Sequence, residues 1–140
     1  MHAMKTHNSK ILGSILILIY LTNTHARVHV QIMNQLEFGR RMSVHCRSRE
    51  DDLQYQILET GSAVEWNFKV NFFRTTLFYC DVQWENSNWY HFDAYDARRD
   101  YRRCKSLCRW MISKEGSLYG YDEDLGFWKM FPLRPSTTTT

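Results

Sequence analysis

Three histidines outside the N-terminal segment, His29, His45 and His91, are the side chains best suited to acid–base chemistry. Imidazole titrates near neutral pH, so two histidines acting as acid and base could cleave RNA, as in a secreted ribonuclease. Each of the three, however, lies in a strand-like run of residues, which favours an outward-facing structural position. The chain also contains no Gly-x-Ser-x-Gly, no His-Glu-x-x-His and no phosphate-binding glycine loop. We therefore expect a protein that is not an enzyme and binds no cofactor.

Four cysteines, Cys46, Cys80, Cys104 and Cys108, could bind a metal or form disulfides. An even number of cysteines in a small secreted chain is typical of two disulfides. A metal site would combine Cys104-x-x-x-Cys108 with Cys46 and His45, but the C-x-x-C pairs usual for zinc are missing, so we expect no metal. A bond between Cys104 and Cys108 would close a very small loop and stabilise little. We therefore expect each of them to pair with Cys46 or Cys80, in an order that the spacing leaves open.

Residues 93–103 form the most polar stretch of the chain, with four arginines, three aspartates and two tyrosines. Arginine and tyrosine often dominate the energetics of protein recognition, and a disulfide at Cys104 would pre-organise this stretch for binding. The alternative is a solubilising loop whose internal ion pairs contribute little. The interleaved aspartates weaken the positive field that binding to RNA requires, so we expect no nucleic-acid partner. The residues predicted to contact a protein partner are Tyr95, Arg98, Arg99, Asp100, Tyr101, Arg102 and Arg103.

The first 26 residues have the pattern of a secretory signal peptide, with an uncleaved anchor as the alternative. Residues 1–10 are basic, residues 11–21 form an apolar run too short to span a bilayer, and Thr24-His25-Ala26 fits the small-x-small cleavage rule. Cleavage after Ala26 would leave one domain, residues 27–134, and a disordered tail, residues 135–140. The full chain has 18 Lys+Arg and 15 Asp+Glu; the leader carries two lysines and no acid, which leaves 16 against 15. A nearly neutral domain has no general attraction to nucleic acid or anionic lipid.

Apolar and polar residues alternate with a period of two along most of the remaining chain, as half-buried antiparallel strands require. Alternating runs occupy residues 28–33, 41–46, 64–71, 78–84 and 108–113, and shorter strands are expected at 53–58, 89–95, 118–121 and 127–131. This pattern predicts an all-β fold: an antiparallel β-sandwich of about eight short strands stapled by two disulfides. Cys46, Cys80 and Cys108 fall on the inward faces, where they would tie one sheet to the other. The best helical candidate, residues 94–105, has no apolar stripe, so we expect a loop there.

An ordered series of short motifs runs through nearly all of the chain after residue 27. They are Val30-Gln-Ile-Met-Asn-Gln-Leu36, Val44-His-Cys-Arg-Ser48, Asp51-Asp-Leu53, Trp66-Asn-Phe68, Thr75-Thr-Leu-Phe-Tyr-Cys80, Trp84, Cys104-x-x-x-Cys108-x-Trp110 and Gly116-x-x-Tyr119. Taken together and in this order, they resemble the plant self-incompatibility S1 proteins, also called S-protein homologues. One position departs from the family pattern: Gln54 follows Asp51-Asp-Leu53, where the family usually carries glycine. Glycine allows a positive φ, so this exchange bears on the local turn and not on the fold.

The resemblance implies a secreted plant protein with a β-sandwich fold, two disulfides and no catalytic residues or cofactor. The best-understood members of the family are extracellular ligands from the pistil that a pollen membrane receptor recognises, and recognition is thought to use surface loops. We therefore expect an extracellular signalling ligand of a cell-surface receptor, monomeric and without a membrane anchor once the leader is cleaved. One alternative is a secreted defence or membrane-active protein, which needs an exposed cationic and apolar surface. A secreted hydrolase is the less favoured alternative.

Overall fold

The structure is a computed structural model that describes residues 14–15 and 27–137. Ser14 and Ile15 are helical, and the rest of the expected signal peptide lies outside the described residues. Residues 27–137 form ten strands and one helix. In chain order these elements are β1 (Val28–Asn34), β2 (Met42–Arg47), β3 (Asp52–Leu58), β4 (Ala63–Phe68), β5 (Leu77–Trp84), β6 (Tyr90–Asp96), α2 (Ala97–Arg103), β7 (Leu107–Ile112), β8 (Leu118–Asp122), β9 (Phe127–Phe131) and β10 (Arg134–Pro135).

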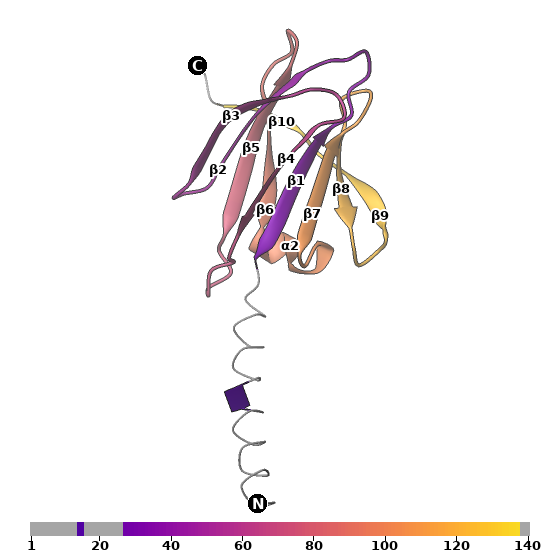
Figure 1. Ribbon diagram of the computed structural model, residues 1–140. Helices are drawn as coiled ribbons and strands as arrows, with labels where there is room; N and C mark the ends of the chain where they lie inside the picture. The colour runs from indigo at the N-terminus through magenta and orange to yellow at the C-terminus, as the bar shows by residue number, and fades with distance from the viewer. Residues whose placement is uncertain (1–13, 16–26, 138–140) are drawn as a thin grey trace, which may run out of the picture.

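The strands form two five-stranded sheets, ordered β4-β1-β7-β8-β9 and β10-β6-β5-β2-β3, which pack face to face (Figure 1). The prediction of an all-β sandwich is therefore confirmed, with ten strands where about eight were expected; β10 is the strand with no counterpart among the expected ranges. One strand pair corrects the expectation of a purely antiparallel arrangement, because β1 and β7 run parallel, with Val30 opposite Cys108 and Ile32 opposite Trp110. All other pairs of the described strands are antiparallel.

The core between the sheets contains the apolar side chains that the alternation placed on the inward faces. Val30 and Ile32 of β1 are fully buried, as are Val82 of β5 and Ile112 of β7. The largest fully buried side chain is Trp110 of β7, whose indole Nε1 donates a hydrogen bond to the carbonyl oxygen of Ala94 at 2.8 Å. This bond satisfies the only polar atom of the indole side chain, so the ring can be buried without an unpaired donor.

The disulfides join Cys46 to Cys80 and Cys104 to Cys108, so the expected pairing across the two sheets is wrong. Cys46 and Cys80 lie directly opposite each other on the antiparallel strands β2 and β5, with their Cα atoms 4.1 Å apart. Cys104 and Cys108 flank the entry into β7, four residues apart. The alternation identified which face each cysteine occupies, but it contains no information on strand register, which decides the pairing. Neither disulfide joins the two layers, so no disulfide reinforces the packing and the Trp110–Ala94 hydrogen bond between them.

The chain after β9 is more ordered than the sequence suggested. Pro135, expected to begin a disordered tail, pairs with Tyr90 in the short β10–β6 ladder. Ser136 donates its backbone N–H to the carbonyl oxygen of Trp89 at 2.9 Å, and its hydroxyl donates to Asp81 Oδ1 at 2.9 Å. The expected tail is therefore wrong for these two residues, and residues 138–140 lie outside the described part of the chain.

Gln54 in β3 adopts a left-handed backbone conformation, with φ +66°. Its N–H donates to Asp52 Oδ1 at 2.9 Å, and the same oxygen lies 2.6 Å from Nε2 of His45. The hydrogen bond from the Gln54 backbone and that from His45 lower the pKa of the Asp52 carboxyl. The backbone at residue 54 thus has the conformation that glycine favours, although the residue is glutamine. The hydrogen bond to Asp52 stabilises this conformation.

Replacing Gln54 with glycine should raise the free energy of unfolding by up to about 1 kcal/mol. The left-handed conformation costs a non-glycine residue about 1–2 kcal/mol, while glycine costs about 0.5–1 kcal/mol more in unfolded-state entropy. Urea denaturation would measure the change. Gln56→Gly is the matched control, since Gln56 is an exposed residue of the same strand outside the positive-φ positions, and it should destabilise. A loss of stability in Gln54→Gly would contradict the strain argument.

Candidate recognition surface

The polar stretch predicted to be a contact loop is in large part the helix α2, which directly follows β6. Asp96 begins the helix: its backbone is extended, and its side-chain Oδ1 accepts a hydrogen bond from the backbone N–H of Arg98 at 3.0 Å. An aspartate in this position satisfies one of the free N–H groups at a helix start. The expectation of a loop is therefore wrong for residues 97–103. The sequence lacked an apolar stripe because the buried face of this helix is largely charged.

That buried face is built around Asp100, which is completely buried. Its carboxylate accepts two hydrogen bonds from Arg99, from Nε at 2.8 Å and Nη2 at 2.7 Å. It accepts a third from Nε of Arg103 at 2.8 Å and a fourth from the backbone N–H of Asp96 at 2.9 Å. Asp100 thus joins the helix to itself and to the end of β6. Burial opposes ionisation of Asp100, but the hydrogen bonds from Arg99 and Arg103 outweigh it, and the pKa of this carboxyl is lowered.

Arg103 extends the network from the helix into the first sheet. Its side chain is only 5% exposed, and Nη1 donates to the carbonyl oxygen of Tyr121 in β8 at 2.9 Å. The guanidinium lies over the ring of Trp110, 4.4 Å from its centroid, which is a favourable cation–π geometry. Gly120 leaves room for this stack, because a Cβ there would meet the Trp110 ring at 2.8 Å and Arg103 Nη1 at 3.0 Å. The helix is therefore anchored largely through charged groups, with Ala97 as its buried apolar residue.

Three of the seven predicted contact residues are consequently inaccessible. Tyr95 is 2% exposed and packs edge-on against Phe68, and burial together with the charge of Asp100 raises the pKa of its hydroxyl. Asp100 and Arg103 form the buried network described above. Asp100 and Arg103 hold the helix and Tyr95 packs in the core, so the prediction that these three residues contact a partner is corrected. A search for exposed polar residues could not distinguish them from their neighbours without knowing which side of the helix faces the sheets.

The remaining predicted residues lie on the outer side of α2. Arg98, Tyr101 and Arg102 are exposed, and we refer to them as the α2 face. The tyrosine ring, whose residue is 48% exposed, has the Arg102 guanidinium carbon 5.4 Å from its centroid and that of Arg74 at 5.9 Å. Arg99 lies at the margin, with its side chain 33% exposed and its guanidinium turned toward Asp100.

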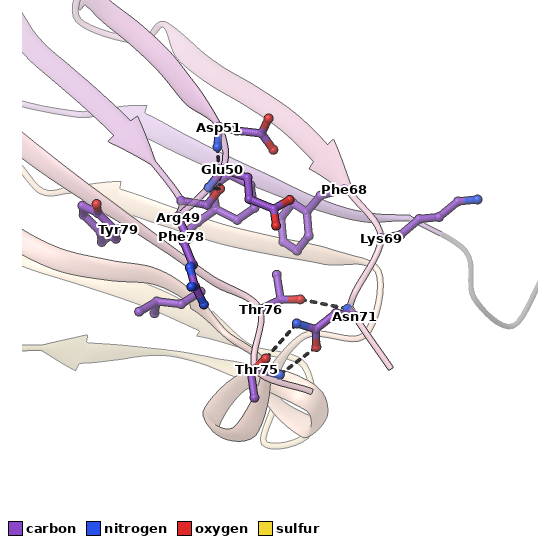
Figure 2. Close-up of a pocket in the computed structure, with 12 residues that line it drawn as sticks. Arg49, Glu50, Asp51, Phe68, Lys69, Asn71, Thr75, Thr76, Phe78 and Tyr79 are labelled. Atoms are coloured by element: carbon purple, nitrogen blue, oxygen red, sulfur yellow. Dashed lines mark hydrogen bonds between the residues drawn. The ribbon is translucent and has the colours of Figure 1, made fainter. Parts of the chain in front are cut away.

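The second part of this surface, which sequence reasoning missed, is the β4–β5 loop, residues 69–76. It lies at the same end of the sandwich as α2, and Arg74 connects the two (Figure 1). Asn71 braces the loop: its side-chain oxygen accepts from the backbone N–H of Thr75 at 2.8 Å, and its own N–H donates to the Thr76 hydroxyl at 2.8 Å (Figure 2). A sequence signal was present, because two adjacent phenylalanines, Phe72 and Phe73, break the alternation between two strands.

Two cavities flank the β4–β5 loop. One, of about 590 Å³, lies toward the β2–β3 turn and includes Arg49, Glu50 and Asp51 in its lining (Figure 2). The other, of about 630 Å³, lies toward α2 and includes Lys69, Arg74, Lys105, Phe72 and Tyr101. The first therefore carries charges of both signs. Of the described residues that line the second, none is acidic.

The histidines considered for catalysis lie on or near the outer faces of the sheets. His45 is only 5% exposed, because the ring of Tyr55 covers it at a centroid distance of 4.1 Å. Nδ1 of His91 lies 2.9 Å from Oδ1 of Asp81, a buried carboxylate of β5. His29 lies 3.0 Å from Glu65 across β1 and β4. Each imidazole thus has a carboxylate partner, and His45 is closed to a substrate.

Two further features concern metals and membranes. Among residues 14–15 and 27–137, no three His, Cys, Asp or Glu side chains gather closely enough to hold a metal ion. Within the same ranges, no helix has both the length and the apolar character needed to cross a membrane.

Two packed sheets, disulfides within a layer and a polar helix anchored at one end define a small, disulfide-bonded β-sandwich protein. Residues 29–132 match the family model described as plant self-incompatibility protein S1, and the chain belongs to this family. The chain is 41% identical over 107 residues to "Self-incompatibility protein S1" of Papaver rhoeas, covering 76% of each chain. It is 40% identical over 98 residues to "S-protein homolog 24" of Arabidopsis thaliana, covering 70% of this chain and 61% of that relative.

A solved structure shares the fold at a TM-score of 0.53 and 20% identity, covering 79% of this chain and 91% of the other. That protein is described as belonging to "a widespread family of small, highly stable, secreted proteins from plants". As a member of the S-protein homologue family, this chain is a small secreted plant protein with two disulfides.

Proposed function

We propose that this protein is an extracellular ligand and that the α2 face contacts a cell-surface receptor. The observation that carries the proposal is that the two sides of α2 have different roles. Asp100 and Arg103 fix α2 from beneath through buried hydrogen bonds, while Arg98, Tyr101 and Arg102 are presented to solvent on its outer side. Residues held in place before binding lose less conformational entropy when a partner is bound.

The chemistry of the α2 face suits protein recognition. Arginine and tyrosine are enriched among the residues that contribute most to binding energy. The Tyr101 ring lies near two guanidinium groups, those of Arg74 and Arg102, which restricts its motion at little cost in solvation. The name of the Papaver rhoeas relative assigns that protein to self-incompatibility, which supports a recognition role here.

A secreted hydrolase has less support. General acid–base catalysis requires a side chain within hydrogen-bond reach of the substrate, and Tyr55 covers His45. His91 is held by Asp81, with its side chain 33% exposed. We therefore retain a non-catalytic ligand as the proposed function.

The double substitution Arg98→Ala with Arg102→Ala should weaken saturable binding of the labelled protein to intact plant cells by at least about tenfold. The melting temperature should stay unchanged, because the anchoring groups Asp100 and Arg103 remain. The matched control is Arg41→Ala with Lys114→Ala, which removes two exposed cations at the opposite end of the sandwich. Binding equal to that of the wild type would show that the α2 face is not the contact surface.

A further inference from the structure

Two adjacent, strongly exposed aromatic side chains lie at the tip of the β4–β5 loop. Phe72 is 89% exposed and Phe73 is 79% exposed, and their rings meet edge to face at a centroid distance of 5.4 Å. Soluble proteins rarely expose two adjacent large apolar residues without a partner for them. The hydrogen bonds of Asn71 with Thr75 and Thr76 hold the loop in this form, so the loop has a defined conformation that presents the two rings at its tip.

Cations lie immediately behind this aromatic tip. Lys69 and Arg74 flank the phenylalanines in the sequence, and both line the cavity on the α2 side together with Lys105. We call this cavity the cationic groove. Lys69 lines both cavities, and Figure 2 shows its side chain directed away from Glu50 and Asp51, the acidic residues of the cavity on the other side of the loop. After residue 26 the chain has 16 Lys+Arg against 15 Asp+Glu, whereas the described charged residues that line the groove are all cations. An acidic residue outside this lining, Glu123, accepts a hydrogen bond at Oε2 from the backbone N–H of Lys105 at 3.1 Å.

We infer that this end of the molecule docks on an anionic lipid membrane, with Phe72 and Phe73 inserted into the interface and lipid phosphates bound at the cationic groove. An anionic bilayer has negatively charged headgroups on the outside and apolar chains beneath them. A convex aromatic tip with cations set behind it is complementary to that order. Aromatic side chains anchor proteins at membrane interfaces, and basic residues add attraction to anionic headgroups.

The inference goes beyond the receptor proposal and does not depend on it. The two surfaces adjoin, because Tyr101 of the α2 face also lines the cationic groove. The residues substituted in the two tests differ: Phe72, Phe73, Lys69 and Lys105 here, and Arg98 with Arg102 for the receptor. If both hold, the protein lies on the membrane that carries its receptor, with the α2 face beside the bilayer. Binding of the purified protein to pure lipid vesicles, which contain no receptor, tests the membrane inference separately from the receptor proposal.

The test is flotation of the purified, oxidised protein with two kinds of vesicle: phosphatidylcholine alone, and phosphatidylcholine containing about one-quarter phosphatidylserine. The wild type should bind the anionic vesicles, and raised salt should weaken this binding because it screens the headgroups. Phe72→Ser with Phe73→Ser should reduce the affinity at least about tenfold. Lys69→Gln with Lys105→Gln should reduce it about 25-fold, since each cation near an anionic surface contributes roughly fivefold.

Matched controls are available at the opposite end of the sandwich. Phe38 in the β1–β2 loop is 87% exposed, close to the value for Phe72 (Figure 1). Phe38→Ser therefore tests whether loss of any exposed phenylalanine weakens binding to vesicles. Lys114→Gln tests an exposed cation there in the same way. Both control variants should bind anionic vesicles like the wild type.

Three results would overturn the inference: equal binding of the wild type to neutral and anionic vesicles, no binding to either, or unchanged binding of the Phe72→Ser, Phe73→Ser variant. A protein contact at the tip would give a different pair of results. The wild type would not bind vesicles, and the Phe72→Ser, Phe73→Ser variant would lose binding to a protease-sensitive component of cells. Melting temperatures of all variants should equal that of the wild type, because every substituted side chain is exposed.

Discussion

Replacing Asp100 with asparagine should lower the free energy of unfolding by about 3–5 kcal/mol, the range found when one partner of a buried ion pair is removed. The reason is the arginines that remain. Arg103 is 5% exposed and would keep its charge without a carboxylate. The amide nitrogen that replaces Oδ2 could not accept the hydrogen bonds from Arg99 Nη2 and from the backbone N–H of Asp96. Chemical denaturation with a linear extrapolation would measure the change.

The matched control is Asp96→Asn, the same substitution four residues earlier in the chain. Asp96 caps α2, and asparagine caps a helix about as well as aspartate, so this variant should stay within about 0.5 kcal/mol of the wild type. A loss below about 1 kcal/mol in Asp100→Asn would mean that the network does not anchor the helix.

The difference between wild type and Asp100→Asn should also depend on pH. The pKa of Asp100 is lowered in the folded protein, so its stabilising contribution is complete above the unfolded-state pKa, near 3.9. As pH falls through the lower, folded-state pKa, Asp100 takes up a proton and the contribution is lost. The two proteins should therefore differ fully at neutral pH and converge in strong acid, which denaturation at several pH values would show.

Removing the Cys46–Cys80 disulfide by substituting both residues with serine should cost about 3–4 kcal/mol, more than removing Cys104–Cys108, for which about 2 kcal/mol is expected. The difference follows from loop size, because the first bond spans 34 residues and the second spans four. A cross-link over a longer loop removes more conformational freedom from the unfolded chain.

Thermal unfolding of the two double variants beside the wild type would test this order, with reduced wild type as a reference for the loss of both bonds. Mass spectrometry before and after reduction should first confirm that each variant keeps the other disulfide. Equal losses in the two variants would contradict the loop-size argument and would point to the packing around the cysteines as the main term.

Much of the fold could be predicted from the sequence, because strands of a sandwich alternate residue by residue. Val30 and Ile32 in β1 and Val82 in β5 lie inward, as their period of two indicated. Which strands pair with each other could not be predicted, since strand pairing depends on contacts between segments that are distant in the sequence. The parallel pairing of β1 with β7 is one example, and the direct opposition of Cys46 and Cys80 is another.

The candidate site was predicted in part, and its errors have a common physical cause. The sequence pointed to the right segment, and Arg98, Tyr101 and Arg102 are exposed as expected. It misassigned Asp100 and Arg103, because charged residues are rarely buried unless they are paired, and the sequence did not show that these two pair. The helix was missed for the same reason, since periodicity searches look for an apolar stripe. Tyr95 was also misassigned, because it lies on the inward face of β6.

The position of β1 has a consequence for the order in which this protein can fold. β1 is the first strand to be synthesised, yet it lies between β4 and β7, and β7 begins at Leu107. Until β7 emerges, the first sheet consists only of the β1–β4 ribbon, and two-stranded ribbons are marginal in water. The β2–β5 pair and its disulfide need only residues up to Trp84. The second layer can therefore assemble and be oxidised early, and the first layer closes only when the segment from Leu107 onward is synthesised.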